Sequence, residues 1–342
     1  MSPRPPLEAS RVLCIAPHWV GDSLFFLPAV DALRRRFSGA AFGLLAKPGI
    51  VALLKDSGRF DRVHPLPSGA GRWARFHAHW ALRKEKYDLA VVFPDSFSSA
   101  FAAALSGARV RAGRSCEGRG LLLSSGLRLP RRRRDRHVVD EYLELAEACG
   151  AAAVGEERDP AFTPSEAGAR EFRESLKARP AGDGPLVGLC PTSAYGPAKQ
   201  WPPERWSALA RALKSRGFAP IFFCAPDEKK KVESIAAAAG GLAVLAPTLA
   251  GLAAGLKACE TVVANDSGPL HLAAAVGARC LGLYGPVDPA WSGPRSPRAR
   301  SLYLDLDCSP CHARVCPLKH QDCLRRISVE RVLAALEEAA EG

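Results

Sequence analysis

The feature that most constrains the fold is an alternation of short apolar runs with amphipathic segments of helical period. Residues 11–16, 41–45 and 88–93 are apolar runs of strand length, whereas residues 21–37 place Leu, Val and Phe at helical spacing. Buried strands that alternate with helices are typical of a parallel sheet covered by helices on both faces. The sequence therefore predicts an α/β fold.

The alternation occurs twice along the chain. The first set is completed by strands at 61–66 and 109–112 and by helices at 48–55, 72–84, 97–105 and 138–149. A polar segment follows, and the second set has strands at 186–190, 220–224, 260–264 and 279–284, with helices at 203–216, 227–239 and 268–276. We predict two Rossmann-like domains, 1–165 and 180–327, with a ligand cleft between them, and a terminal helix within 328–342.

The glycine motifs of two common nucleotide-binding classes are missing. No G-x-G-x-x-G follows the first strand of either half, and no G-x-x-x-x-G-K-[ST] occurs in the 342 residues. Because these motifs are the main sequence evidence for a dinucleotide-dependent dehydrogenase or a P-loop NTPase, their absence argues against both classes.

The net charge of +12 predicts an anionic partner. Residues 1–180 carry 29 basic and 20 acidic side chains, and the rest carries 18 and 15. We expect the N-terminal domain to meet the larger anion. A nucleic-acid-binding protein would share this charge, but the sequence has no helix-turn-helix, RNP aromatics or zinc-finger spacing.

Eleven cysteines raise the question of compartment. We find no secretory signal and no uncharged apolar run of about 18 residues, so we expect a cytoplasmic protein with free thiols. Four cysteines in strand-like runs are expected in the core: Cys14, Cys190, Cys224 and Cys280.

The first candidate site segment, residues 16–23, lies at a strand-to-helix turn. Gly21 permits a tight turn, and Asp22 follows at the carboxyl end of the strand. A carboxylate there can accept a proton from a bound hydroxyl group. The alternative is that Asp22 only caps the helix.

The second segment, residues 191–202, follows the first strand of the second half. The hydroxyl groups of Thr192 and Ser193 and the charge of Lys199 suit a diphosphate. An ordinary loop with an exposed lysine is the alternative. We expect Trp201 to anchor this loop in the core.

The third segment, residues 264–275, joins a strand to a helix rich in small residues. The helix N-terminus, at Ser267, Gly268 and Leu270, would offer backbone N–H groups to an anion. Asp266 would support the loop or the sugar part of a nucleotide. His271 is either a hydrogen-bond donor to the ligand or a packed core residue.

Four motifs in the same order resemble glycosyltransferase family 9, the ADP-heptose:lipopolysaccharide heptosyltransferases, and most closely the heptosyltransferase II branch. They are Trp19-Val20-Gly21-Asp22, Gly196-Pro197-Ala198-Lys199-Gln200-Trp201-Pro202, Asn265-Asp266-Ser267-Gly268 with His271, and Tyr284-Gly285-Pro286. The resemblance implies a GT-B fold, with the acceptor on the first domain and the nucleotide-sugar on the second. It also implies that the terminal helix packs back on the first domain.

The implied activity is inverting transfer of heptose from ADP-L-glycero-β-D-manno-heptose to the lipid A–Kdo–heptose inner core of lipopolysaccharide. Asp22 is then the base, Lys199 and the helix end neutralise the leaving diphosphate, and either Asp227 or Glu228 holds the ribose. We predict no cofactor and no catalytic metal, because no metal-binding Asp-x-Asp is placed for the diphosphate and Lys199 and the helix end are available instead. The resemblance places the protein at the cytoplasmic face of the inner membrane.

Two features suggest how the acceptor is held. Trp19 lies in the first motif, and a basic run contains Arg131, Arg132, Arg133 and Arg134. This run would meet the phosphates or carboxylates of the lipid acceptor at the membrane surface. The alternative is a solvated basic loop.

Four cysteines gather near the C-terminus: Cys308, Cys311, Cys316 and Cys323. Thiols at this spacing would be reduced structural residues, ligands of a structural zinc ion, or partners in a disulfide bond.

Two alternatives to the implied function remain. One is transfer to another acceptor, such as a first or later core heptose or a protein hydroxyl, and the other is a nucleotide-sugar-binding module without catalysis. The presence of Asp22 argues against the second.

Overall fold

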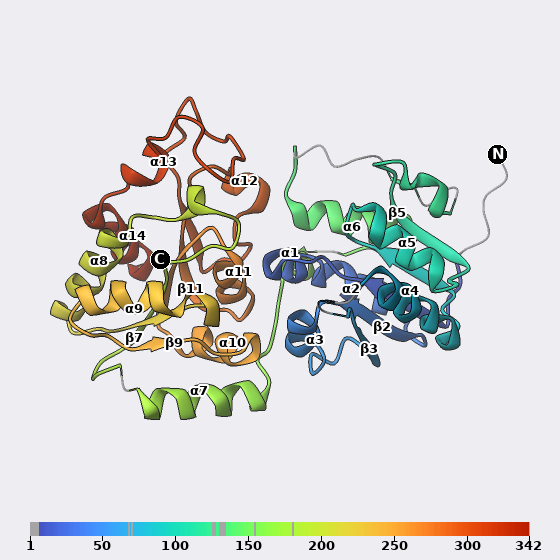
Figure 1. Ribbon diagram of the computed structural model, residues 1–342, viewed down its shortest axis with the longest axis horizontal. Helices are drawn as coiled ribbons and strands as arrows, with labels where there is room; N and C mark the ends of the chain where they lie inside the picture. Colours follow the sequence, from blue (N-terminus) through green and yellow to red (C-terminus); the bar gives the residue numbers. More distant parts are fainter. Residues whose placement is uncertain are drawn as a thin grey trace. The chain divides into compact units, whose positions relative to one another are not determined.

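The computed structural model describes residues 7–67, 69, 71–124, 128–129, 135–153, 155–179 and 181–341. The chain divides into two compact units, Met1–Pro160 and Ala161–Gly342 (Figure 1). Each unit contains a fully parallel sheet with helices, as the α/β prediction requires.

The first unit is built on a sheet with strand order β3-β2-β1-β4-β5-β6. The strands are β1 (Arg11–Ile15), β2 (Ala41–Ala46), β3 (Arg62–Pro65), β4 (Leu89–Val92), β5 (Val110–Arg114) and β6 (Arg128–Leu129). The α-helices are α1 (Val20–Phe25), α2 (Leu27–Arg36), α3 (Pro48–Leu54), α4 (Arg72–Ala81), α5 (Phe97–Leu105) and α6 (Val138–Ala148). The 3₁₀ turns are η1 (Leu82–Glu85), η2 (Arg119–Leu122) and η3 (Gly155–Arg158).

The single helix expected at residues 21–37 is two helices. Phe26 separates α1 from α2 and is the N-cap residue of α2. Pro28 lies in the first turn of α2, where its missing N–H costs no helical hydrogen bond; inside one continuous helix it would break the bond to the preceding turn. The break keeps α1 short and leaves it as the element that carries Asp22.

The second unit repeats the plan with strand order β9-β8-β7-β10-β11-β12. The strands are β7 (Leu186–Cys190), β8 (Ala219–Phe223), β9 (Val244–Leu245), β10 (Thr261–Asn265), β11 (Arg279–Leu283) and β12 (Ala299–Leu302). The α-helices are α7 (Glu166–Ala178), α8 (Pro203–Ser215), α9 (Lys229–Ala238), α10 (Leu249–Ala258), α11 (Gly268–Ala275), α12 (Pro289–Ser292), α13 (Asp322–Arg325) and α14 (Val329–Glu341). The 3₁₀ turns are η4 (Pro197–Lys199) and η5 (Pro226–Glu228).

The terminal helix α14 packs within its own unit. Ser328 accepts a hydrogen bond from the backbone N–H of Arg331, which fixes the start of the helix. Val332 and Leu333 are buried in a core that includes Trp206. The apolar side of α14 contacts α8, β11 and β12.

Both sheets have the same strand order when each is counted from its own first strand. In such a sheet the chain leaves the first strand toward one side and later returns to the other, so ligands bind beyond the carboxyl ends of the two central strands. These central pairs are β1 with β4 and β7 with β10. The three site segments predicted from the sequence follow β1, β7 and β10.

Among the described residues, no helix combines the length and apolar composition needed to cross a membrane.

Candidate active site

Asp22 lies in the first turn of α1, directly beyond the carboxyl end of β1. The N-cap residue of α1 is Trp19, so Asp22 does not cap the helix. Instead, its Oδ1 accepts a hydrogen bond of 3.2 Å from the hydroxyl group of Tyr142 on α6. The hydroxyl group of Ser23 donates to the carbonyl groups of Pro17 and Trp19 and holds the turn closed. Asp22 is thus a partly exposed carboxylate in a fixed position, which suits a general base.

Nothing in the sequence indicated a role for Tyr142. The residue lies 120 positions after Asp22, in a helix whose apolar period predicts only core packing. Its ring is buried against Phe93 in an edge-to-face contact with centroids 5.6 Å apart. The phenol is therefore held rigidly and orients the carboxylate.

A pocket of about 460 Å³ opens at the carboxyl ends of β1 and β2 in the same unit. Its polar lining includes His18, Lys47, Arg75, His79 and Ser98. Burial lowers the pKa of His18, and the nearby charge of Lys47 lowers it further. Burial and then Arg75 lower the pKa of His79 in the same way. Neutral imidazoles are favoured at neutral pH, so the fixed positive charges of the pocket are Lys47 and Arg75.

Of the predicted acceptor-binding residues, Trp19 lies near this pocket, with the Lys47 ammonium 6.0 Å from its ring centroid. Arg131–Arg134 lie outside the described residues.

In the second unit, the segments after β7 and β10 meet in a buried charged cluster. Lys199 Nζ lies 2.5 Å from Asp266 Oδ2, and His271 Nε2 lies 3.8 Å from Asp266 Oδ1. Burial alone would raise the pKa of Asp266, but its interactions with His271 and Lys199 outweigh burial and hold that pKa below its usual value. An ionised Asp266 therefore fixes Lys199 in place, and Lys199 is not the exposed lysine of an ordinary loop.

The loop that carries Lys199 is bound on several sides. Trp201 is buried, and its backbone N–H donates to Asn265 Oδ1 over 3.0 Å, which confirms its role as an anchor. The amide of Gln321 donates to the carbonyl groups of Pro197 and Gln200 over 2.8 and 2.9 Å. The segment around Cys308–Cys323 thus supports the loop, a function that its sequence did not indicate.

Two cationic side chains lie close to the ring of Tyr195 in this loop. Its ring centroid lies 4.5 Å from Lys199 Nζ and 5.3 Å from the guanidinium carbon of Arg314, while its hydroxyl group donates to the carbonyl of His312. Gly196 has φ 149°, and a Cβ atom there would lie 2.6 Å from the carbonyl oxygen of Arg314. Only glycine allows the two segments to approach this closely.

Some of the remaining residues predicted for the donor site support the loops, and others are exposed. Thr192 and Ser193 are buried, and the Ser193 hydroxyl group donates to the carbonyl of Asp266 over 3.4 Å. Ser267 is the N-cap residue of α11, ahead of Gly268, and its hydroxyl group donates to the carbonyl of Asn265. Leu270 has a buried side chain, and its backbone N–H donates to Ser267, so it contributes packing. Asp227 is exposed and Glu228 partly exposed, both in η5 after β8.

The four C-terminal cysteines are free thiols that line one small pocket together with Ala198. Burial, and then the neighbouring Cys308, Cys311 and Cys316, raise the pKa of Cys323 to about 11. In the described part of the chain, no three His, Cys, Asp or Glu side chains are arranged to hold a metal ion. Of the four expected core cysteines, Cys224 is only partly buried and the other three are buried.

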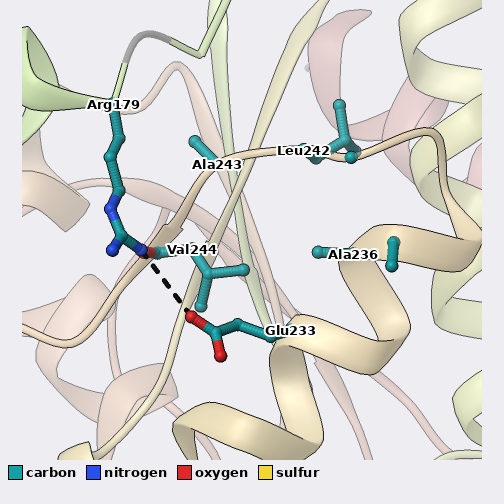
Figure 2. A pocket seen from close by; sticks show the side chains of 8 residues that line it. Arg179, Glu233, Ala236, Leu242, Ala243 and Val244 are labelled. Carbon is teal, nitrogen blue, oxygen red and sulfur yellow. Dashed lines mark hydrogen bonds and ion pairs between the residues drawn. The ribbon is translucent and has the colours of Figure 1, made fainter.

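A separate pocket of about 330 Å³ lies beside β9 and α9 (Figure 2). Arg179 and Glu233 form an ion pair of 3.8 Å across it, and the rest of the lining is mostly alanine and other apolar residues. It contains none of the residues predicted for the site.

The sequence profile of glycosyltransferase family 9 (heptosyltransferase) matches residues 75–321, which include the two segments, after β7 and after β10, that form the buried charged cluster. The chain belongs to glycosyltransferase family 9. As a family 9 member it is a glycosyltransferase enzyme, and the expected GT-B fold class is confirmed.

Two curated relatives in family 9 match most of the chain. Lipopolysaccharide heptosyltransferase 2 of Escherichia coli is 29% identical over 307 residues, which cover 86% of this chain and 88% of the relative. Lipooligosaccharide heptosyltransferase 2 of Haemophilus influenzae is 30% identical over 310 residues, with the same coverage. The solved structure of E. coli ADP-heptose lps heptosyltransferase II superposes with a TM-score of 0.80 at 26% identity and covers 96% of this chain and 98% of that one.

Proposed function

We propose that this protein transfers heptose from ADP-L-glycero-β-D-manno-heptose to the inner core of lipopolysaccharide, on an acceptor of lipid A, Kdo and one heptose. The observation that carries the proposal is the similarity over 86% of the chain to relatives named heptosyltransferase 2, combined with the oriented Asp22 carboxylate and the charged cluster around Lys199. The solved relative is named for ADP-heptose, which supports this donor.

Asp22 acts as the general base in this mechanism. Its Oδ2 is free of the Tyr142 hydrogen bond, which is made to Oδ1, and accepts the proton of the acceptor hydroxyl group as that oxygen attacks the anomeric carbon. The bond from the anomeric carbon to the diphosphate breaks in the same step. One displacement of this kind inverts the anomeric configuration.

The leaving diphosphate needs positive charge. Lys199 and Arg314, which lie around the ring of Tyr195, supply two cations, and the positive end of the α11 dipole lies at the same edge of the sheet. Asp266 holds Lys199 in position and His271 steadies Asp266. We propose that these side chains suffice without a cofactor or a catalytic metal, and that Asp227 or Glu228 binds the ribose.

The pocket of the first unit would receive the acceptor. Lys47 and Arg75 are suited to a carboxylate or phosphate group on a sugar, and Ser98 and His18 can hydrogen-bond to its hydroxyl groups. An acceptor that is a lipid places the enzyme at a membrane, which we propose is the cytoplasmic face of the inner membrane.

The test is ADP release from ADP-heptose with Kdo₂-lipid A, with and without one prior heptose. We expect ADP release only with the acceptor that already carries heptose, and unchanged turnover after incubation with EDTA. Equal turnover without the prior heptose would instead identify an enzyme that adds the first heptose. Absence of release with either acceptor would overturn the proposed substrate.

A further inference from the structure

One face of α4 carries aromatic side chains that the fold leaves in solvent. Trp73, Phe76 and Trp80 recur at intervals of three and four residues, so they lie on one side of the helix. Trp73 is 78% exposed and Trp80 is 48% exposed. The rings of Phe76 and Trp80 stack with centroids 5.8 Å apart, which joins them into one apolar strip.

The neighbouring helix α5 carries a second pair of exposed aromatic side chains. The helix packs against α4, and Phe97 and Phe101 on it are 50% and 40% exposed and stack on each other at 6.3 Å. We call these five side chains, from Trp73 to Phe101, the aromatic surface. Exposed apolar groups gathered in this way mark an interaction site more often than isolated ones do.

The charge along α4 and the turn that follows it is of one sign. Between residues 72 and 84 the chain has four Arg or Lys residues and no Asp or Glu. Arg83 lies over the ring of Trp80, 4.2 Å from its centroid, and the next acidic residue, Glu85, pairs with Arg62 at 3.3 Å. Exposed Trp and Phe beside Arg and Lys are typical of helices that lie in the head-group region of an anionic bilayer.

A neighbouring side of α4 lines the pocket of the first unit. Arg75 and His79 of this helix line that pocket, together with Ser98 and Ala102 of α5. The helix pair therefore contributes to the pocket and, on a neighbouring side, to the aromatic surface. A bilayer that holds the aromatic surface would lie close to the pocket that receives the sugar.

We propose that the aromatic surface docks this protein on a bilayer with anionic head groups. The rings enter the interface, while Arg72, Arg83 and Lys84 meet lipid phosphates. The contact keeps the lipid part of an acceptor in the membrane while its sugar part reaches the pocket; this purpose, though not the docking itself, rests on the proposed function.

Vesicle co-sedimentation of the full chain tests the proposal without any catalytic readout. We expect binding to vesicles of phosphatidylcholine and phosphatidylglycerol at 7:3, at least about tenfold stronger than to phosphatidylcholine alone. The affinity of the double variant W73S/W80S for these anionic vesicles should be at least about tenfold lower than that of the wild type. Vesicles with brominated acyl chains should quench the tryptophan fluorescence of the wild type and quench that of the variant less.

Val315→Ser is the matched control, because Val315 is an exposed apolar residue of the second unit. It should bind vesicles like the wild type, and circular dichroism should show that all variants are folded. ADP release with a water-soluble, delipidated acceptor should be the same for W73S/W80S and the wild type, which separates docking from chemistry. Equal vesicle binding by W73S/W80S would overturn the proposal. The proposal would also be overturned if light scattering showed the wild type to be a dimer and W73S/W80S a monomer, with vesicle binding the same for both.

Discussion

At the scale of single residues, the site depends on pairs that lie far apart in the sequence. Asp22 and Lys199 were predicted from their motifs and from the family resemblance, with a helix cap and an ordinary loop lysine as the alternatives. Their partners were not predicted: Tyr142 looks like a core residue in its own helix, and Asp266 was expected to support a loop or a sugar. Local pattern suggests a candidate reacting group, whereas only tertiary structure shows the group that orients it.

Asp266→Asn tests the buried ion pair. Loss of the charge leaves Lys199 buried without its counterion, so we expect the free energy of unfolding at pH 7 to fall by about 3 kcal/mol. The fold holds the pKa of Asp266 below its ordinary 3.8, so its stabilising contribution is full above pH 3.8 and is lost as the pH falls through the lower, folded value. Urea unfolding across this range should show the difference between wild type and variant narrowing only below pH 3.8. A constant difference down to the lowest pH at which both fold would contradict this account.

At the scale of elements, strands and helices with clear period were predicted closely. The strand expected at 186–190 is β7, and the helix expected at 97–105 is α5. Two of the longer helices, α7 and α10, were missed. Residues 166–178 are polar enough to resemble a linker, yet they form α7, whose Phe172 is buried. Residues 249–258 are apolar on all sides and so lack the helical period of α10.

The Lys199 loop is an element whose shape comes from a distant segment. Gln321→Ala removes the amide that donates to the carbonyl groups of Pro197 and Gln200. We expect the KM for ADP-heptose to rise about tenfold and the KM for the acceptor to stay unchanged, because the loss of these hydrogen bonds loosens only the donor loop. Steady-state kinetics with each substrate varied in turn measures both. Arg326→Ala, an exposed change five residues later, should leave both constants as in the wild type; a matching rise there would contradict the role of Gln321.

At the scale of the whole molecule, two units with the same strand order carry different charges. The excess of basic residues before residue 180 first indicated only an anionic partner. The pocket with Lys47 and Arg75 and the basic edge of α4 show where part of that charge is presented. Neither was predicted, because these side chains come from separate elements that only the fold brings to one side of the sheet.

The role of the basic run in the first half of the chain is tested by replacing Arg131–Arg134 with Ser. We expect the KM for the lipid acceptor to rise at least about tenfold at low ionic strength, since each arginine near an anionic surface contributes about 1 kcal/mol. The rise should shrink as salt screens these charges. Calorimetric titration of ADP-heptose should give the wild-type Kd. Unchanged acceptor kinetics at low salt would mean that this run is a solvated loop.

Asp22→Asn tests whether Asp22 is the base of a heptosyl transfer, with the rate of ADP release measured from ADP-heptose and the heptose-bearing acceptor. The amide keeps the size of the side chain and its contact with Tyr142 but cannot take a proton. We predict a fall in kcat of about 10²- to 10⁴-fold, with the Kd for ADP-heptose unchanged. Turnover within a few-fold of the wild type would contradict the account.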